Sequence, residues 1–144
     1  MIDVQIKSSV RGKIAVGLIA RAARAALGRR AAQVSIAVVG DARMRSINRD
    51  ALGHDYSTDV LSFDHGDSPE GMQVELVVCL PFAARAAREH GVPVEQELAR
   101  YVVHGCLHCT GLDDTSDAKR NVMWREQERV LKALFGKRYR AGTE

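Results

Sequence analysis

The sequence is poor in aromatic residues, in cysteine and in long apolar runs, and each shortage excludes a class of protein. Aromatic side chains make up only 5% of the 144 residues, which argues against an extended platform for stacked bases. The three cysteines do not form the even framework typical of secreted disulfide-rich domains. No apolar run reaches the roughly 18 residues of a membrane span. We therefore expect one cytoplasmic domain over residues 1–144, with no membrane partner.

The net charge is only +3, but it is distributed unevenly along the chain. Residues 1–49 hold ten basic and two acidic side chains, a net charge of +8, whereas residues 50–118 hold three and thirteen, a net charge of −10. Residues 119–144 return to a net charge of +5. Basic ends and an acidic middle suggest an anionic partner bound by the ends and a cation bound by the middle. Helix faces that simply contact solvent are the alternative.

Hydrophobic patterning predicts an α+β fold with a mixed four-stranded sheet and about five helices. Strands are expected at about 2–7, 33–39, 58–63 and 74–80, and helices from Ser8 or Ser9 to Leu27, from Asp41 to Arg49, from Pro81 to Gly91, from Pro93 to near Gly111, and from Ser116 to Phe135. The long helix between the first two strands predicts that they pair in parallel. The continuously apolar strand 74–80 is typical of a central position. Residues 51–57 and 66–71 are expected to be loops, the second a mobile flap.

Two histidines followed by a carboxylate are the most informative feature of the chain. His104 and His108 are four residues apart, so on a helix their side chains project from the same face. Gly111 can end that helix in a left-handed turn, after which the chain can double back and bring Asp114 to the same point. Two imidazoles and a carboxylate make a three-ligand site for one divalent ion, and zinc is the expected ion. The open fourth position is the catalytic rather than the structural pattern.

The residues around the histidines narrow the interpretation of this helix. Its apolar flank indicates burial, and two unpaired buried histidines would be costly, although an incidental pair is the alternative. Zinc proteases of the His-Glu-x-x-His type carry a glutamate base directly after the first histidine, where this chain has Gly105. The site is therefore poorly equipped for peptide hydrolysis but could still polarise a phosphoryl oxygen. Cys106 and Cys109 are interpreted as small core residues, with a redox or second metal pair as the alternative.

Two basic stripes are the candidates for contact with the phosphates of a nucleic acid. One is expected on the first helix and the other on the last: Lys13, Arg21 and Arg24, and Arg125, Arg129 and Lys132. The first would lie opposite the apolar face of its helix, and the second would share one face of the last helix. Arginine suits bidentate contact with the phosphates of an anionic partner.

Two sequence blocks resemble the YbeY family, the bacterial endoribonucleases of rRNA maturation. The block His104-Gly-x-Leu-His108-x-x-Gly111-x-Asp113 resembles the family signature His-Gly-x-Leu-His-Leu-x-Gly-Tyr-Asp-His. The block Ile47-Asn48, with Thr58-Asp59-Val60-Leu61-Ser62-Phe63 beginning ten residues after Asn48, resembles the family's Leu-Asn and Thr-Asp-Val-Leu-Ser-Phe. The resemblance implies a zincin-like α+β fold with one metal ion on a helix. It also implies endonucleolytic cleavage of single-stranded RNA and work on the small ribosomal subunit.

The chain departs from the family pattern at three places. The family's third histidine falls at Asp114, a tolerable change because carboxylates bind zinc well. The family's Tyr-Arg pair falls at Ala51 and Leu52, and that arginine is thought to serve the substrate phosphate, which Leu52 cannot do. Arg49, one helical turn earlier, is the candidate replacement and joins the first-helix stripe as a nucleic-acid-binding residue. The family's motif tyrosine falls at Leu112.

Three functional hypotheses follow from these residues. The first is a single-metal zinc endoribonuclease that acts on single-stranded rRNA, with His104, His108 and Asp114 as ligands. Its attacking group could be water or the 2′-OH, and no general base or other catalytic residue is identifiable from the sequence. The second is a non-catalytic, metal-stabilised module that binds RNA or the ribosome, which the loss of the arginine at Leu52 favours. The third is a zinc hydrolase of another class, such as a peptidase, which Gly105 disfavours.

Overall fold

Nine helices and strands, arranged around one sheet, make up the computed structural model, which describes residues 1–141. They are β1 (Ile2–Ser8), α1 (Val16–Leu27), β2 (Ala32–Val39), α2 (Asp41–Leu52), β3 (Val60–Ser68), β4 (Gly71–Cys79), α3 (Leu80–His90), α4 (Val94–Cys109) and α5 (Asp117–Phe135). A 3-10 turn, η1 (Gly136–Arg138), follows α5. The four predicted strands and five predicted helices are therefore all confirmed. None of the helices in the described part of the chain is long and apolar enough to cross a membrane.

The sheet is mixed and has the strand order β1-β2-β4-β3. β1 pairs with β2 in parallel, as the connecting helix α1 predicts, and β2 pairs with β4 in parallel. β3 runs antiparallel to β4 and forms one edge. β4 lies between β2 and β3, which confirms the central position predicted for it. Its sequence is apolar because helices cover one of its faces and part of the other.

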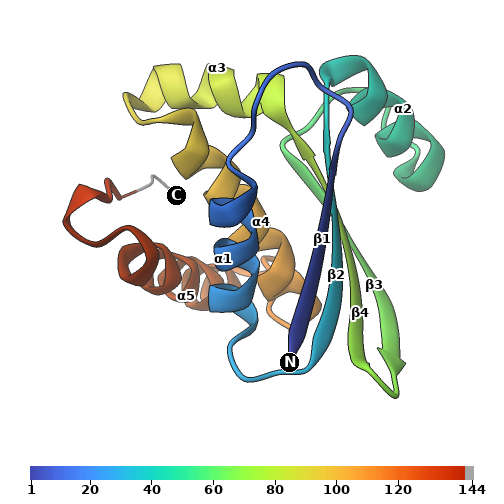
Figure 1. Ribbon diagram of the computed structural model, residues 1–144, viewed down its shortest axis with the longest axis vertical. Helices are drawn as coiled ribbons and strands as arrows, with labels where there is room; N and C mark the ends of the chain where they lie inside the picture. Colours follow the sequence, from blue (N-terminus) through green and yellow to red (C-terminus); the bar gives the residue numbers. More distant parts are fainter. Residues whose placement is uncertain (142–144) are drawn as a thin grey trace.

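Three layers build the molecule: the sheet, then α1 with α4, then α5 packed against both of these helices (Figure 1). The first interface is filled by alternate strand residues, such as Val34, Ile36 and Leu76, and by the apolar faces of α1 and α4. A smaller cluster around Met44 of α2 covers the end of the opposite sheet face near Cys79. This placement leaves α4 sandwiched between the sheet and α5, so side chains of α4 and α5 can meet in a protected layer.

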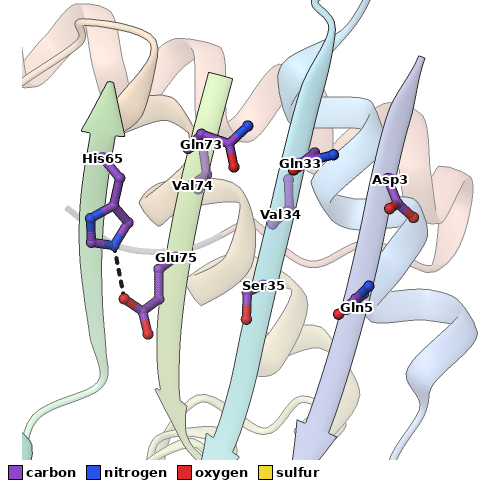
Figure 2. Close-up of a pocket in the computed structure, with 9 residues that line it drawn as sticks. All are labelled: Asp3, Gln5, Gln33, Val34, Ser35, His65, Gln73, Val74 and Glu75. Atoms are coloured by element: carbon purple, nitrogen blue, oxygen red, sulfur yellow. Dashed lines mark hydrogen bonds and ion pairs between the residues drawn. The ribbon is translucent and has the colours of Figure 1, made fainter. Parts of the chain in front are cut away.

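The rest of the second sheet face is open and polar (Figure 2). Its side chains come from all four strands and form a shallow hollow: Asp3, Gln5, Gln33, Ser35, His65, Gln73 and Glu75. His65 Nε2 lies 2.9 Å from Glu75 Oε1, which links β3 to β4. Because the neighbouring residues Val34 and Val74 are buried toward α1 and α4, this hollow faces away from the histidine helix.

The prediction that the first helix starts at Ser8 or Ser9 is wrong. The Ser9 N–H donates to the carbonyl of Val38 at 3.0 Å, so this backbone extends the sheet instead of capping a helix. Gly12 then adopts φ of 91°, a left-handed conformation that breaks helical geometry, and α1 begins at Val16. Lys13 therefore lies in the connecting loop rather than on the α1 stripe.

The prediction of a loop over residues 66–71 is also wrong, because this segment closes a β-hairpin. β3 extends to Ser68 and pairs with β4 through a register shift between Asp64 and Asp67. Gly71 has φ of 103°, and a Cβ there would lie 2.2 Å from the carbonyl oxygen of Ala31, so only glycine fits at this turn. The polar residues of the segment belong to strands with a solvated face, which their composition alone did not reveal.

Candidate metal centre

His104 and His108 face one another on α4. Their Nε2 atoms are 3.1 Å apart, and their rings meet edge to face with centroids 4.7 Å apart. Both side chains are half-buried, because the rest of α4 is enclosed by the sheet, α1 and α5. The prediction that the two histidines share one face of a helix is therefore confirmed, and their spacing of one helical turn brings two imidazole nitrogens close together.

The chain reverses directly after α4 and brings a carboxylate to the two imidazoles. α4 ends at Cys109, and Gly111 takes φ of 104° while its N–H donates to the carbonyl of His108 at 3.1 Å. This is the left-handed turn predicted at Gly111. His104, His108 and Asp114 each offer one ligand atom, and these three atoms all lie within 4.8 Å of one another. The three side chains are thus close enough to hold one metal ion.

The two adjacent aspartates of this loop have different contacts. Asp113 Oδ1 accepts hydrogen bonds from the Thr115 N–H at 3.1 Å and the Thr115 hydroxyl at 2.8 Å, and these bonds lower the pKa of Asp113. Its other oxygen lies 3.7 Å from Lys119 Nζ. Asp113 therefore holds its own loop in shape, whereas the carboxylate of Asp114 is exposed and turned toward the imidazoles.

Gln127 of α5 fixes the orientation of the His104 ring. Its Oε1 lies 2.8 Å from His104 Nδ1, so His104 donates Nδ1–H and its Nε2 lone pair is directed toward His108. Gln127 is only 6% exposed. Sequence reasoning missed this residue, although one signal was present: Gln127 shares the apolar face of α5 with Met123, Val130 and Leu131. A single amide side chain on an apolar face is buried on folding, and a buried amide needs a hydrogen-bond partner.

The electrostatics of His108 favour a neutral ring. Burial lowers the pKa of this imidazole, and the neighbouring His104 lowers it further. The carboxylates of Asp114 and Asp113 and a backbone hydrogen bond with Leu112 act in the opposite direction. A neutral imidazole with a free lone pair is the form that coordinates a metal ion.

Gly105, next to His104, is required by the packing of α4 on the sheet. A Cβ at this position would lie 2.8 Å from Cδ2 of the fully buried Leu76 and 3.4 Å from Cγ2 of Val60. The position that carries the glutamate base in His-Glu-x-x-His proteases therefore points at the core, where a side chain would require the buried Leu76 to shift.

A cavity of about 250 Å³ opens beside His104 and Asp114. Further residues that line it come from the start of β3, from α4 and from the inner face of α5: Asp59, Arg100, Tyr101, Arg120, Met123, Trp124 and Gln127. Arg100 is held by Glu128 at 2.9 Å and by the hydroxyl of Tyr139 at 2.9 Å. Two positive side chains therefore lie next to the candidate ligands, and the sequence motifs had pointed to neither.

The structure places the other candidate residues away from this cavity. Arg49 lies on exposed α2, where it pairs with Asp50 at 3.3 Å and with Asp55 at 4.0 Å, and it does not line the cavity. Arg21 and Arg24 are exposed on α1 opposite its buried face, as expected.

The two cysteines of α4 are buried free thiols, and burial raises the pKa of Cys106 to about 12 and that of Cys109 to about 11. Both are packed in the main hydrophobic cluster. Their interpretation as core residues is confirmed by this burial, and the raised pKa values agree with unreactive thiols.

Comparison with known proteins agrees with the motifs and the geometry. The family described as endoribonuclease YbeY matches residues 3–135. Endoribonuclease YbeY of Aromatoleum aromaticum is 42% identical over 117 residues, covering 81% of this chain and 75% of that protein. Endoribonuclease YbeY of Pelotomaculum thermopropionicum is 38% identical over 143 residues, covering 88% and 94%.

The fold is also found in a solved structure. The solution structure of the Thermotoga maritima protein TM1509 superimposes with a TM-score of 0.63 at 25% identity, covering 95% of this chain and 91% of that one. The family match over nearly the whole chain and the two close relatives confirm the resemblance carried by the histidine and Thr-Asp-Val-Leu-Ser-Phe blocks. The chain belongs to the endoribonuclease YbeY family.

Proposed function

We propose that this protein is a single-metal endoribonuclease that cleaves single-stranded RNA in the maturation of small-subunit rRNA, with one zinc ion on His104, His108 and Asp114. One observation carries the proposal: three ligand atoms within 4.8 Å of one another, in a chain of a family whose members are named endoribonucleases. Work on the ribosome and a cytoplasmic setting belong to the same proposal. The three buried free cysteines agree with a reducing compartment.

The donor set fits zinc. Two imidazole nitrogens and a carboxylate oxygen are common zinc ligands, and three protein ligands leave a fourth position for water or substrate. The Gln127 contact leaves the lone pair of His104 Nε2 free on the side that faces His108. A zinc ion bound there would supply Lewis acidity toward a phosphoryl oxygen and would lower the pKa of a bound water. Gln127 keeps the His104 ring aligned. The position of a protease base is occupied by Gly105, which has no side chain and faces the core.

Contact with the RNA backbone is proposed for arginines near the centre. A groove of about 510 Å³ runs between the end of α1 and α5 and is lined by Arg30, Arg125 and Arg129, with Glu126 between them. It borders Thr110 and Leu112, in the turn that connects His108 to Asp114. Arg129 is paired with Glu126. Arg125 is exposed, and its Nε donates to the Asn121 carbonyl of its own helix at 3.3 Å. Guanidinium groups in such a groove can each neutralise a phosphate.

The second candidate is a metal-stabilised RNA- or ribosome-binding module without catalysis. One observation favours it: Leu52 is exposed at the end of α2, and the nearby Arg49 is engaged with Asp50 and Asp55. The position of the family arginine therefore holds an apolar side chain, and Arg49 does not line the cavity beside the candidate ligands.

A cleavage assay distinguishes these candidates. We expect purified protein to cut single-stranded RNA, a chelator to stop the reaction, and His104→Ala to lose both zinc and cleavage. His65→Ala is the matched control, because His65 lies on the open sheet face away from the centre and should leave both unchanged. Cleavage by the chelated protein or by His104→Ala would refute the proposal. RNA binding with bound zinc but no cleavage would favour the second candidate.

A further inference from the structure

The face of α5 that meets the candidate centre carries more than the residue that orients His104. Arg120, Trp124 and Gln127 follow one another at helical spacings of four and three residues, so they lie on one side of the helix. All three line the cavity that also contains His104 and Asp114. Gln127 is accounted for by its bond to His104. Arg120 and Trp124 are not used by the metal centre.

Arg120 presents its guanidinium at the loop that bears a candidate ligand. Its Nη2 lies 3.5 Å from the backbone oxygen of Asp114, and its Nη1 pairs with Asp117 at 2.8 Å. The side chain of Asp117 is 94% exposed and that of Arg120 is 54% exposed. An ion pair so open to water contributes little, and a substrate phosphate can take the place of Asp117. The guanidinium fork then binds the phosphate in a bidentate manner next to the centre.

Trp124 is the only tryptophan of the chain and stands one helical turn further into the same cavity. Its ring is half-buried, and its indole N–H is buried without a hydrogen-bond partner among the described residues. Trp124 lines the cavity together with Arg120. An aromatic side chain beside a phosphate-binding arginine is a combination on which an unpaired base can stack.

We propose that Arg120 and Trp124 form a one-nucleotide subsite beside the metal centre, in which Arg120 binds a phosphate and Trp124 stacks on the base of a single-stranded RNA. The inference rests on the proposed function and deepens it, because it states why the substrate must be unpaired at this position. The cavity of about 250 Å³ is slightly smaller than the roughly 300–1,000 Å³ typical of drug-sized ligands, in keeping with one nucleotide rather than several. A base within a duplex would present no free face to Trp124.

The single tryptophan makes the subsite directly observable. Zinc-loaded protein is titrated with a short 2′-O-methyl oligoribonucleotide, which has no free 2′-OH, and with an abasic strand of equal length and charge. We expect the normal strand to quench the Trp124 fluorescence in a saturable manner and the abasic strand to bind more weakly without quenching. Fluorescence that stays constant while the normal strand binds would overturn the stacking contact.

Variants test the two residues separately, with affinity measured by the anisotropy of a labelled strand. Trp124→Leu should weaken binding by about 5- to 150-fold, and Trp124→Phe should retain most of the affinity because it keeps a flat ring. Arg120→Gln should reduce the slope of log K against log salt by about 0.7. Arg88→Gln, an equal change of charge on exposed α3, should leave this slope unchanged. Parental affinity in Trp124→Leu, or an unchanged slope in Arg120→Gln, would contradict the subsite.

Failure of the subsite and failure of the proposed function give different results. If the protein cleaves RNA in a zinc-dependent manner while Trp124→Leu and Arg120→Gln bind like the parent, the subsite is wrong and the endoribonuclease proposal stands. If the quenching and both affinity losses occur but no RNA is cleaved, the subsite stands and the catalytic proposal is wrong. Circular dichroism of each variant shows whether its fold is retained, and Trp124→Phe keeps the test valid if the leucine variant is unstable.

Discussion

Gln127 is the residue on which the alignment of the His104 imidazole depends, since it alone is bonded to His104 Nδ1 among the described residues. We predict that Gln127→Ala lowers zinc affinity by about 10- to 100-fold, as the loss of such an orienting partner does elsewhere. Gln127→Glu should keep the affinity, because a carboxylate oxygen also accepts the Nδ1–H. Gln96→Ala is the control: Gln96 is equally buried on α4 but donates to the Arg140 carbonyl. Competition with a chromogenic chelator measures the affinity, and an unaffected Gln127→Ala would exclude the orienting role.

Asp114, rather than Asp113, is the predicted third ligand. Asp114→Ala should lose most of the zinc affinity, and Asp114→His should retain it because an imidazole also fits a tetrahedral site. Asp113→Ala should have a smaller effect, through the loop that Asp113 holds by its bonds to Thr115. Isothermal titration of the metal-free variants with zinc provides the comparison. Tight binding by Asp114→Ala together with weak binding by Asp113→Ala would show the opposite assignment.

The sequence predicts which site residues lie close together when their spacing on one helix sets that proximity. His104, His108 and the turn at Gly111 belong to this class, because the periodicity of α4 and one left-handed glycine fix their relation. The positions of Arg120 and Trp124 could not be predicted in this way, because their place in the cavity beside the centre depends on how α5 packs against α4. Sequence reasoning accordingly chose Arg49 for the substrate phosphate, whereas the structure brings Arg100 and Arg120 to the cavity.

At the level of elements, the seating of α4 depends on the absence of a side chain at Gly105. We predict that Gly105→Ala lowers the free energy of unfolding by about 1–3 kcal/mol, because the new methyl group overlaps the buried Leu76. Gly17→Ala on α1 is the control, since a Cβ there meets only Arg21 Nη1 at 3.6 Å and should raise helix stability by about 0.5–1 kcal/mol. Urea denaturation measures both variants. Equal or greater stability of Gly105→Ala would show that α4 does not need this close approach.

The outer face of α5 is the element predicted to hold the RNA backbone. Reversal of Arg125 to Glu in the groove should weaken binding of single-stranded RNA, and each lost phosphate contact should reduce the slope of log K against log salt by about 0.7. Arg43→Glu is a control of equal charge on α2. Filter binding over a series of salt concentrations gives the slopes. If the RNA affinity of the parent protein did not change with salt concentration, binding through phosphate contacts would be contradicted.

Helices and strands were predictable in number and order but less so at their ends. α1 begins at Val16 because the backbone of Ser9 is bonded to β2 and Gly12 turns the chain, and both effects depend on the sheet. α2 continues to Leu52, beyond the expected end at Arg49, until Gly53 adopts φ of 75°. The sequence pattern did not predict the β3–β4 hairpin, because polar residues of these strands face solvent on the open side of the sheet and resemble a loop in composition (Figure 2).

At the scale of the whole molecule, α5 packs on the layer that α1 and α4 form against the sheet (Figure 1). The cavity beside the candidate centre is lined mainly by α4 and α5. The class of fold and the parallel first pair of strands followed from the alternation of strands with helices. The position of α5 could not be predicted, because the periodicity of α5 does not indicate which face of α4 it covers. A bound zinc ion would join α4 to the loop before α5, so its removal should also lower the thermal stability of the whole domain.

The most direct test of the account is the recovery of RNA cleavage as zinc is added back to chelated protein. If His104, His108 and Asp114 hold one catalytic ion, cleavage of single-stranded RNA should be absent at the start, rise in proportion to zinc and level off at about one zinc per chain. Full cleavage before any zinc is added, or no recovery when zinc is bound at this ratio, would contradict a single-metal endoribonuclease.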